Sequence, residues 1–158
     1  MNEMIIIRGI PGSGKSSIAE EYASKGYAVL STDDYFTDAN GLYVFDGSKI
    51  SIAHAWNRGR ARLLLSAGIL NIVIDNTNTQ AWEYSTYIDL AKTHKYDVKI
   101  IRVIAVNKDG DEIQRANFYS ANNRHNVPLD VITKMIARFT DDPIEEITYN
   151  KFEHIDYI

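Results

Sequence analysis

The chain has 158 residues, with 17 lysines and arginines against 21 acidic residues and no cysteine. This length suits one domain with a complete core, and the lack of cysteine excludes disulfides and thiolate-bound metal. No apolar run approaches the ~20 residues of a membrane span, and residues 1–10 lack the pattern of a signal peptide. We therefore expect a cytoplasmic protein with no membrane partner. The net charge of −4 argues against a protein that coats nucleic acid.

The negative charge is concentrated at the end of the chain. Residues 141–158 hold six acidic side chains and one lysine, a net charge of −5, which leaves +1 for all the other residues together. We expect one domain over residues 1–158, with a nearly neutral body and an acidic tail at 141–158.

Apolar runs alternate with helical patterns along the chain. We expect strands at residues 4–8, 27–31, 71–75 and 98–106, and a last strand at 147–149 or 152–158. We expect helices at residues 16–24, 51–67, 80–94, 109–119 and 128–139. Strands that alternate with helices form βαβ units, and uninterrupted apolar runs are typical of strands buried on both faces. The sequence therefore predicts an α/β fold with a mostly parallel sheet.

Residues 9–16 read Gly-Ile-Pro-Gly-Ser-Gly-Lys-Ser, a full match to the P-loop pattern, between a predicted strand and a predicted helix. Glycines let backbone N–H groups surround a phosphate, and the helix N-terminus favours its negative charge. In such loops the lysine reaches the β- and γ-phosphates and the following serine binds Mg²⁺. The sequence thus predicts ATP and Mg²⁺ as cofactors; the alternative is a glycine-rich turn without a ligand. The expected nucleotide contacts are Gly9, Gly12, Ser13, Gly14, Lys15, Ser16 and Ser17.

Three aspartates follow predicted strands and so belong to the carboxyl edge of the sheet, where ligands bind in open α/β folds. Asp33 and Asp34 follow the second strand, and either supplies the carboxylate that phosphoryl transfer needs to accept the proton of a hydroxyl. The alternative for both is a solvated turn. Asp75 ends the third strand, where it holds Mg²⁺ together with Ser16 or simply begins a turn.

The chain resembles the P-loop kinase domains of the NEDD4-binding-protein-2-like group, which is related to the 5′-hydroxyl polynucleotide kinases of phages. The resemblance covers about residues 4–140. Besides residues 9–16 it rests on residues 30–36, 43–46, 53–57 with 60–61, 74–82 and 125–128. It implies a kinase-type P-loop NTPase fold, a three-layer α/β/α sandwich with a small helical lid at about 109–128. It also implies an ATP-dependent kinase that acts on the 5′-hydroxyl of a nucleic acid.

The resemblance also implies roles for particular residues. Lys15 and Ser16 bind phosphate and Mg²⁺, Asp33 is the general base, and Asn76 and Asn78 lie beside the acceptor. Members of the group carry Arg-Asn-Lys-His-Gly-Val-Pro in the lid, whereas residues 122–128 here read Asn-Asn-Arg-His-Asn-Val-Pro. Asn122 therefore stands in place of the first arginine and Asn126 in place of the glycine. Arg124, as a catalytic residue, or Arg115, as a nucleotide contact, would replace the missing arginine.

The acceptor side of the site is less strongly defined. His54, Arg58 and Arg62 lie four residues apart on one face of a predicted helix, where they would bind the phosphates of a polynucleotide or form a solvated basic face. The predicted acceptor contacts are Asp34, Arg58, Arg62, Asn76 and Asn78.

Aromatic residues and histidines add further expectations. The aromatic residues Tyr35, Phe36, Tyr43 and Phe45 form either a wall of the acceptor pocket or a small separate core. Trp56 stacks on a base or fills the core, Trp82 belongs to the core, and His125 is structural or exposed. No histidine pattern indicates zinc.

Three functions fit this pattern. The first is transfer of the γ-phosphoryl group of ATP to the 5′-hydroxyl of single-stranded RNA or DNA. The second is a kinase of the same fold that acts on a small molecule such as a nucleoside, sugar or antibiotic, which does not need the basic stripe. The third is a nucleotide-binding module without kinase activity, suggested by the departures at Asn122 and Asn126.

Overall fold

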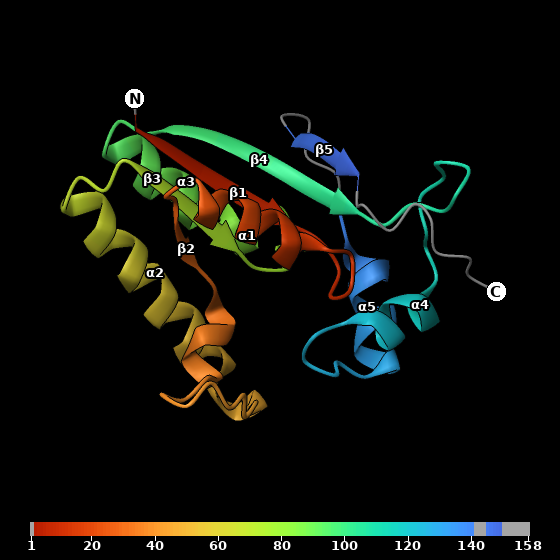
Figure 1. Cartoon of the computed structure of the whole chain (residues 1–158). Coiled ribbons are helices and arrows are strands. Elements are labelled where there is room, and N and C mark those ends of the chain that lie inside the picture. The colour runs from red at the N-terminus through yellow and green to blue at the C-terminus, as the bar shows by residue number, and fades with distance from the viewer. Residues whose placement is uncertain (1, 141–144, 150–158) are drawn as a thin grey trace.

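The computed structural model describes residues 2–140 and the backbone of residues 145–149. Five parallel strands form one sheet in the order β2-β3-β1-β4-β5, as Figure 1 shows. The strands are β1 (Glu3–Arg8), β2 (Ala28–Leu30), β3 (Asn71–Asp75), β4 (Asp97–Ile104) and β5 (Glu145–Tyr149). The parallel sheet predicted from the alternation of strands and helices is confirmed.

Helices connect the strands and cover both faces of the sheet (Figure 1). They are α1 (Lys15–Ser24), α2 (Ile50–Ser66), α3 (Ala81–Thr93), α4 (Ala116–Asn122) and α5 (Leu129–Arg138). Two 3₁₀ turns, η1 (Thr32–Phe36) and η2 (Gly47–Lys49), lie between β2 and α2. In Figure 1, α2 lies toward one end of the molecule and the pair α4–α5 toward the other.

Side chains of the central strand alternate between two cores, as the two-residue period of a strand requires. Met4 and Ile6 are fully buried in a cluster with residues of α2 and α3. Ile5 and Ile7 belong to a second cluster that includes Ile18 of α1. The predicted three-layer α/β/α architecture is therefore confirmed. A third cluster joins α4 and α5 to the residues after β1 and β4, which makes these two helices a small separate layer.

The segment between β4 and α4 differs from the prediction, because residues 109–115 are not helical. Asn107 accepts hydrogen bonds from the N–H groups of Asp109 and Asp111 with its side-chain oxygen, at 2.9 and 3.0 Å. Gly110 then turns the chain with φ +86°, and Val106 and Glu112 form an antiparallel bridge. Asparagine side chains that bond nearby N–H groups favour turns over helix, so the helix begins only at Ala116.

Two further expectations have clear outcomes. Trp82 is 72% exposed, so its prediction as a core residue is wrong. Tyr84 and Tyr87 occupy the buried face of α3, and the indole of Trp82 instead donates to Gln80 at 2.8 Å. At the end of the chain, predicted strand 147–149 lies within β5, whereas 152–158 lies outside the described residues.

Among the described residues, no helix is both long enough and apolar enough to cross a bilayer.

Candidate functional site

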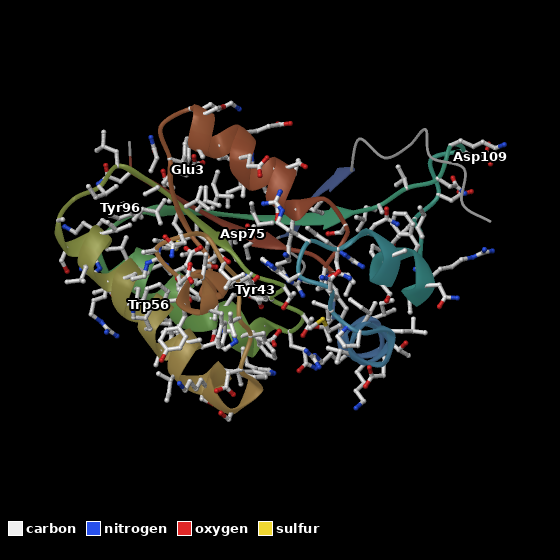
Figure 2. The ribbon with its side chains drawn as sticks, turned by 60° about the horizontal axis from the view of Figure 1, so that its bottom comes forward. Glu3, Tyr43, Trp56, Asp75, Tyr96 and Asp109 are labelled. Carbon is white, nitrogen blue, oxygen red and sulfur yellow. The ribbon has the colours of Figure 1, made fainter. Side chains whose placement is uncertain are left out.

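A large cleft of about 1010 Å³ opens at the carboxyl edge of the sheet. Its walls come from the loop after β1 with the start of α1, from η1, from the loop after β3, and from residues 122–138. In Figure 2, Asp75 at the end of β3 and Tyr43 in the loop after η1 lie toward the middle of the molecule, between α2 and the pair α4–α5. The cleft thus brings together segments that are far apart in the sequence.

The P-loop leads directly into α1, as its sequence predicts. Gly12 and Gly14 have φ values of +90° and +96°, which glycine adopts without steric cost. A Cβ atom on Gly12 would also lie 2.8 Å from the carbonyl oxygen of Tyr119 in α4, so only glycine fits between loop and helix. The predicted nucleotide residues that line the cleft are Gly12, Gly14, Lys15, Ser16 and Ser17, whereas Gly9 and Ser13 do not reach it.

The two neighbouring aspartates of η1 have different surroundings. Asp34 accepts from the backbone N–H of Ser31 at 3.4 Å and forms an ion pair with Arg60 of α2 at 2.9 Å. Within the described residues, no lysine or arginine pairs with Asp33: Tyr43 donates its hydroxyl to Oδ1 at 3.3 Å, and Nε2 of His125 lies 3.5 Å from Oδ2. Both aspartates line the cleft. Asp34 is therefore committed to holding η1 against α2, which favours Asp33 as the reactive carboxylate.

Asp75 places a carboxylate at the bottom of the same cleft. Its Oδ1 atom is buried and has no hydrogen-bond partner in the part of the chain that the structure describes. Burial raises the pKa of Asp75, and the nearby Lys15 ammonium opposes this shift. A buried oxygen without a partner is costly, so this carboxylate fits a bound cation as its partner.

Two asparagines of the β3–α3 loop, both predicted to contact the acceptor, have different surroundings. Asn76 lines the cleft and accepts from the N–H of Thr32 at 2.9 Å, which fixes η1 relative to β3. Asn78 is 2% exposed, lies outside the cleft, and donates to the carbonyl of Ile7 at 2.8 Å. Its φ of +48° is one that asparagine tolerates better than most residues. The structure therefore places Asn78 in the framework that holds this loop, outside the residues that line the cleft.

The predicted basic residues are not all at the cleft. On α2, His54 lines it and lies 3.3 Å from the hydroxyl of Thr32, but Arg58 and Arg62 are not among its lining residues. Burial and the charge of Arg58 lower the pKa of His54. Arg115 is also outside the cleft, whereas Arg124 lines it and pairs with Glu20 of α1 at 3.0 Å.

The predicted lid segment keeps a defined turn despite its departures from the family pattern at Asn122 and Asn126. The side chain of Asn123 accepts from the N–H of Val127 at 2.7 Å and donates to the carbonyl of Tyr119 at 3.0 Å. Asn126 adopts φ +54°, a value that glycine and asparagine tolerate best. The change from glycine to Asn126 therefore leaves the turn intact, and the turn presents Arg124 and His125 to the cleft.

The aromatic residues around η1 divide between core and cleft. Phe36 is 7% exposed and packs edge-on or tilted against Tyr35 and Phe45. Tyr43 and Phe45 line the cleft, so they belong to its wall. Trp56 is not stacked into the core; its ring contacts Tyr35, and the Arg60 guanidinium lies over it at 4.4 Å from the centroid.

Two basic residues that line the cleft, Arg138 and His125, were not predicted as site residues. Arg138, at the end of α5, lines the cleft and donates from Nε to the hydroxyl of Thr79 at 3.1 Å. His125, expected to be structural or exposed, stacks on Tyr43 with ring centroids 3.8 Å apart. The motif at residues 122–128 could have indicated His125 as a site residue. No local sequence pattern indicates Arg138, because only the packing of α5 brings this residue to the β3–α3 loop.

Comparisons with known proteins agree with this geometry. Residues 4–141 match the model of a family described as an AAA domain. NEDD4-binding protein 2 of Homo sapiens is 38% identical over 146 residues, which cover 89% of this chain and 8% of that protein. A putative bifunctional polynucleotide phosphatase/kinase of Acanthamoeba polyphaga mimivirus is 33% identical over 96 residues, covering 60% of this chain and 19% of that protein.

Among solved structures, a gluconokinase from Sinorhizobium meliloti 1021 shares the fold with a TM-score of 0.57 and 17% identity, covering 93% of this chain and 82% of that chain. The chain spans less than a fifth of the length of the two curated relatives. The family match covers most of the chain and includes the P-loop, η1 and residues 109–128. The chain therefore belongs to the AAA domain family and has its kinase-type P-loop α/β fold.

Proposed function

We propose that the chain is an ATP-dependent kinase that transfers the γ-phosphoryl group to the 5′-hydroxyl end of single-stranded RNA or DNA. The observation that carries this proposal is the position of Asp33. Its carboxylate and the P-loop residues Lys15 and Ser16 line one cleft, and Asp33 is free of the ion pair that holds Asp34. A phosphate donor and a carboxylate base that share a cleft are the parts phosphoryl transfer requires.

Different residues bind the phosphates and activate the acceptor hydroxyl. The N–H groups of the P-loop and the Lys15 ammonium bind the phosphates, and Asp33 accepts the proton of the attacking hydroxyl. Arg124, on the lid, approaches the phosphates by exchanging its exposed pair with Glu20 for the negative charge of the nucleotide. We propose that residues 109–128 act as the lid through this movement, so that charge on the transferring group is neutralised when the cleft closes.

Mg²⁺ belongs to this scheme because Asp75 fits it. A hard cation takes oxygen ligands, and the buried Oδ1 of Asp75 together with the Ser16 hydroxyl supplies them. When bound, the ion would neutralise negative charge on the phosphate oxygens. The protein's own contribution is to hold these two oxygens on the wall that Lys15 shares.

Two observations support a nucleic-acid acceptor. The mimiviral relative is described as a polynucleotide phosphatase/kinase, and it aligns with 60% of this chain. Arg138 adds a cationic group to the cleft that contains Asp33. A cleft with cationic side chains suits an acceptor that carries phosphates.

A small-molecule hydroxyl is the second candidate acceptor, and one observation favours it. The predicted phosphate-binding stripe does not face the cleft as a whole, because only His54 of its three members lines it. Phosphorylation assays with radiolabelled ATP separate the two acceptors, using hydroxyl-ended RNA and DNA oligonucleotides beside a panel of nucleosides, sugars and aminoglycosides.

The two neighbouring aspartates provide the test of the base. We expect Asp33→Asn to lower transfer by roughly 10²–10⁴-fold, the usual contribution of general base catalysis, with ATP affinity nearly unchanged. Asp34→Asn is the matched control. It makes the same chemical change one residue away, on a side chain that pairs with Arg60. Equal loss in both variants, or retained turnover in Asp33→Asn, would contradict the assignment.

A further inference from the structure

We propose that His125 and Tyr43 are positioning residues that act through Asp33: the His125 ring of the lid lies on Tyr43, and together the two side chains fix the carboxylate of the base from both sides. This inference rests on the proposed function, because it assigns Asp33 the role of base. It adds a second task to the lid, which then aligns the base as well as covering the phosphates.

Three contacts among residues distant in sequence carry the proposal. The rings of Tyr43 and His125 stack with centroids 3.8 Å apart and an angle of 21° between their planes. The Tyr43 hydroxyl donates to Oδ1 of Asp33 at 3.3 Å, and Nε2 of His125 lies 3.5 Å from Oδ2. All three side chains line the cleft. Each oxygen of the carboxylate thus faces one member of a stacked pair.

Both rings are supported by ordered backbone. Tyr43 forms an isolated antiparallel bridge with Thr37, and the next residue, Val44, donates its N–H to the carbonyl of Phe36 at 2.8 Å. His125 lies inside the lid turn whose ends are joined by the 2.7 Å hydrogen bond between Val127 and Asn123. A stack between two fixed segments constrains the groups that it carries, so the pair is able to orient Asp33.

The chemistry of the two groups suits this task. Burial and the charge of Asp33 raise the pKa of Tyr43, so its phenol keeps the proton that it donates to Oδ1. That leaves Oδ2 as the oxygen available to the proton of the acceptor, and His125, in the tautomer with hydrogen on Nε2, directs an N–H toward it from 3.5 Å. A displacement of about 1 Å at a reacting group costs up to ~10²-fold in rate, so this alignment is worth a measurable part of the turnover.

Three variants separate the ring stack from the polar contacts. Tyr43→Phe keeps the ring and removes the hydroxyl, and His125→Phe keeps a ring and removes Nε2. His125→Gln removes the ring and keeps an N–H that reaches a similar position. We expect kcat to fall about tenfold in both phenylalanine variants, while the KM for ATP stays within about twofold. We expect His125→Gln to recover part of the lost kcat, because it restores the donor but not the ring stack.

His94→Gln is the control, because it makes the same change at the end of α3, on a histidine that does not line the cleft. Thermal melting checks each variant for folding, and Tyr43→Phe, which loses one oxygen atom, remains informative where a histidine variant is unstable. Wild-type kcat in well-folded Tyr43→Phe and His125→Phe would overturn the proposal. So would a loss in His125→Gln equal to that in His125→Phe, because a donor at Oδ2 would then have no role.

An Asp33→Asn background separates this inference from the proposed function. If both hold, Tyr43→Phe and His125→Phe cause no further loss in that background, because positioning acts only through the missing carboxylate. If Asp33→Asn alone keeps wild-type turnover, the proposed base is wrong. If Asp33→Asn is inactive and the phenylalanine variants are fully active, the positioning role is wrong and the proposed function stands.

Discussion

Asp75 carries a carboxylate at a buried position of the cleft, where stability and the proposed chemistry have opposite requirements. Burial raises its pKa, which means that the fold favours the protonated form. Above this raised pKa the ionised carboxylate lowers the stability of the free protein, and below the ordinary pKa of an aspartate, about 4, the cost is absent. A bound cation would reverse the cost, which is why an otherwise unfavourable residue has a use here.

We therefore expect Asp75→Asn to raise the melting temperature of the nucleotide-free protein at pH 7 and to abolish Mg²⁺-dependent transfer. The gain in stability disappears below about pH 4, because Asp75 of the wild type is then protonated in both the folded and the unfolded protein. Asp89→Asn, on the exposed face of α3, is the control and leaves the melting temperature unchanged. A variant that is less stable than the wild type at pH 7 would contradict this account.

The position of a residue in the site was predictable from the sequence where its contacts come from neighbouring residues in the chain. Lys15 and Ser16 occupy the expected positions because the P-loop is one continuous segment. The choice between Asp33 and Asp34 remained open in the sequence, because it depends on Arg60, which lies 26 residues from Asp34. Arg58 and Arg62 were placed on one helix face, but the sequence does not say which part of that face meets the cleft.

At the scale of elements, Arg8 joins the end of β1 to two other segments. Its guanidinium is fully buried and donates to the carbonyls of Asn78 at 2.7 Å, Thr79 at 3.0 Å and Thr140 at 2.6 Å. The rings of Tyr84 and Phe139 lie on the guanidinium at 4.9 and 4.6 Å. Because Arg8 immediately precedes the P-loop, these contacts set the loop's position relative to the β3–α3 loop and the end of α5.

We expect Arg8→Met to lower the free energy of unfolding by roughly 3 kcal/mol, since three carbonyl oxygens lose the donor they face and unmade buried hydrogen bonds cost about 1–3 kcal/mol each. Urea denaturation measures the loss. Arg62→Met on the exposed side of α2 is the control and stays within about 0.5 kcal/mol of the wild type. A loss below about 1 kcal/mol for Arg8→Met would show that these carbonyls find other donors.

The elements were predictable where the hydrophobic pattern is strong and misjudged where side chains compete with the backbone. The uninterrupted run of β1 gave the right strand, and Met4 and Ile5 do point to opposite cores. The helix predicted over 109–119 failed because the Asn107 side chain satisfies the N–H groups that a helix would use. The prediction that Trp82 belongs to the core was wrong because two other aromatic residues already fill the inner face of α3.

At the scale of the whole molecule, the net charge of −4 hides an uneven distribution, because the last 18 residues carry −5. The body of the chain is nearly neutral, and four of the basic side chains at the cleft are Lys15, His54, Arg124 and Arg138. Such a distribution suits a site that holds one nucleotide and one strand end with a 5′-hydroxyl, rather than a surface that covers a polymer.

The acceptor assay tests this account most directly. Purified protein is incubated with Mg²⁺, γ-labelled ATP and single-stranded oligonucleotides that end in either a 5′-hydroxyl or a 5′-phosphate, beside the small-molecule panel. The account predicts label on the 5′-hydroxyl oligonucleotides alone, in the wild type and in Asp34→Asn but not in Asp33→Asn. Label only on a small molecule, or nucleotide binding without transfer to any acceptor, would contradict it.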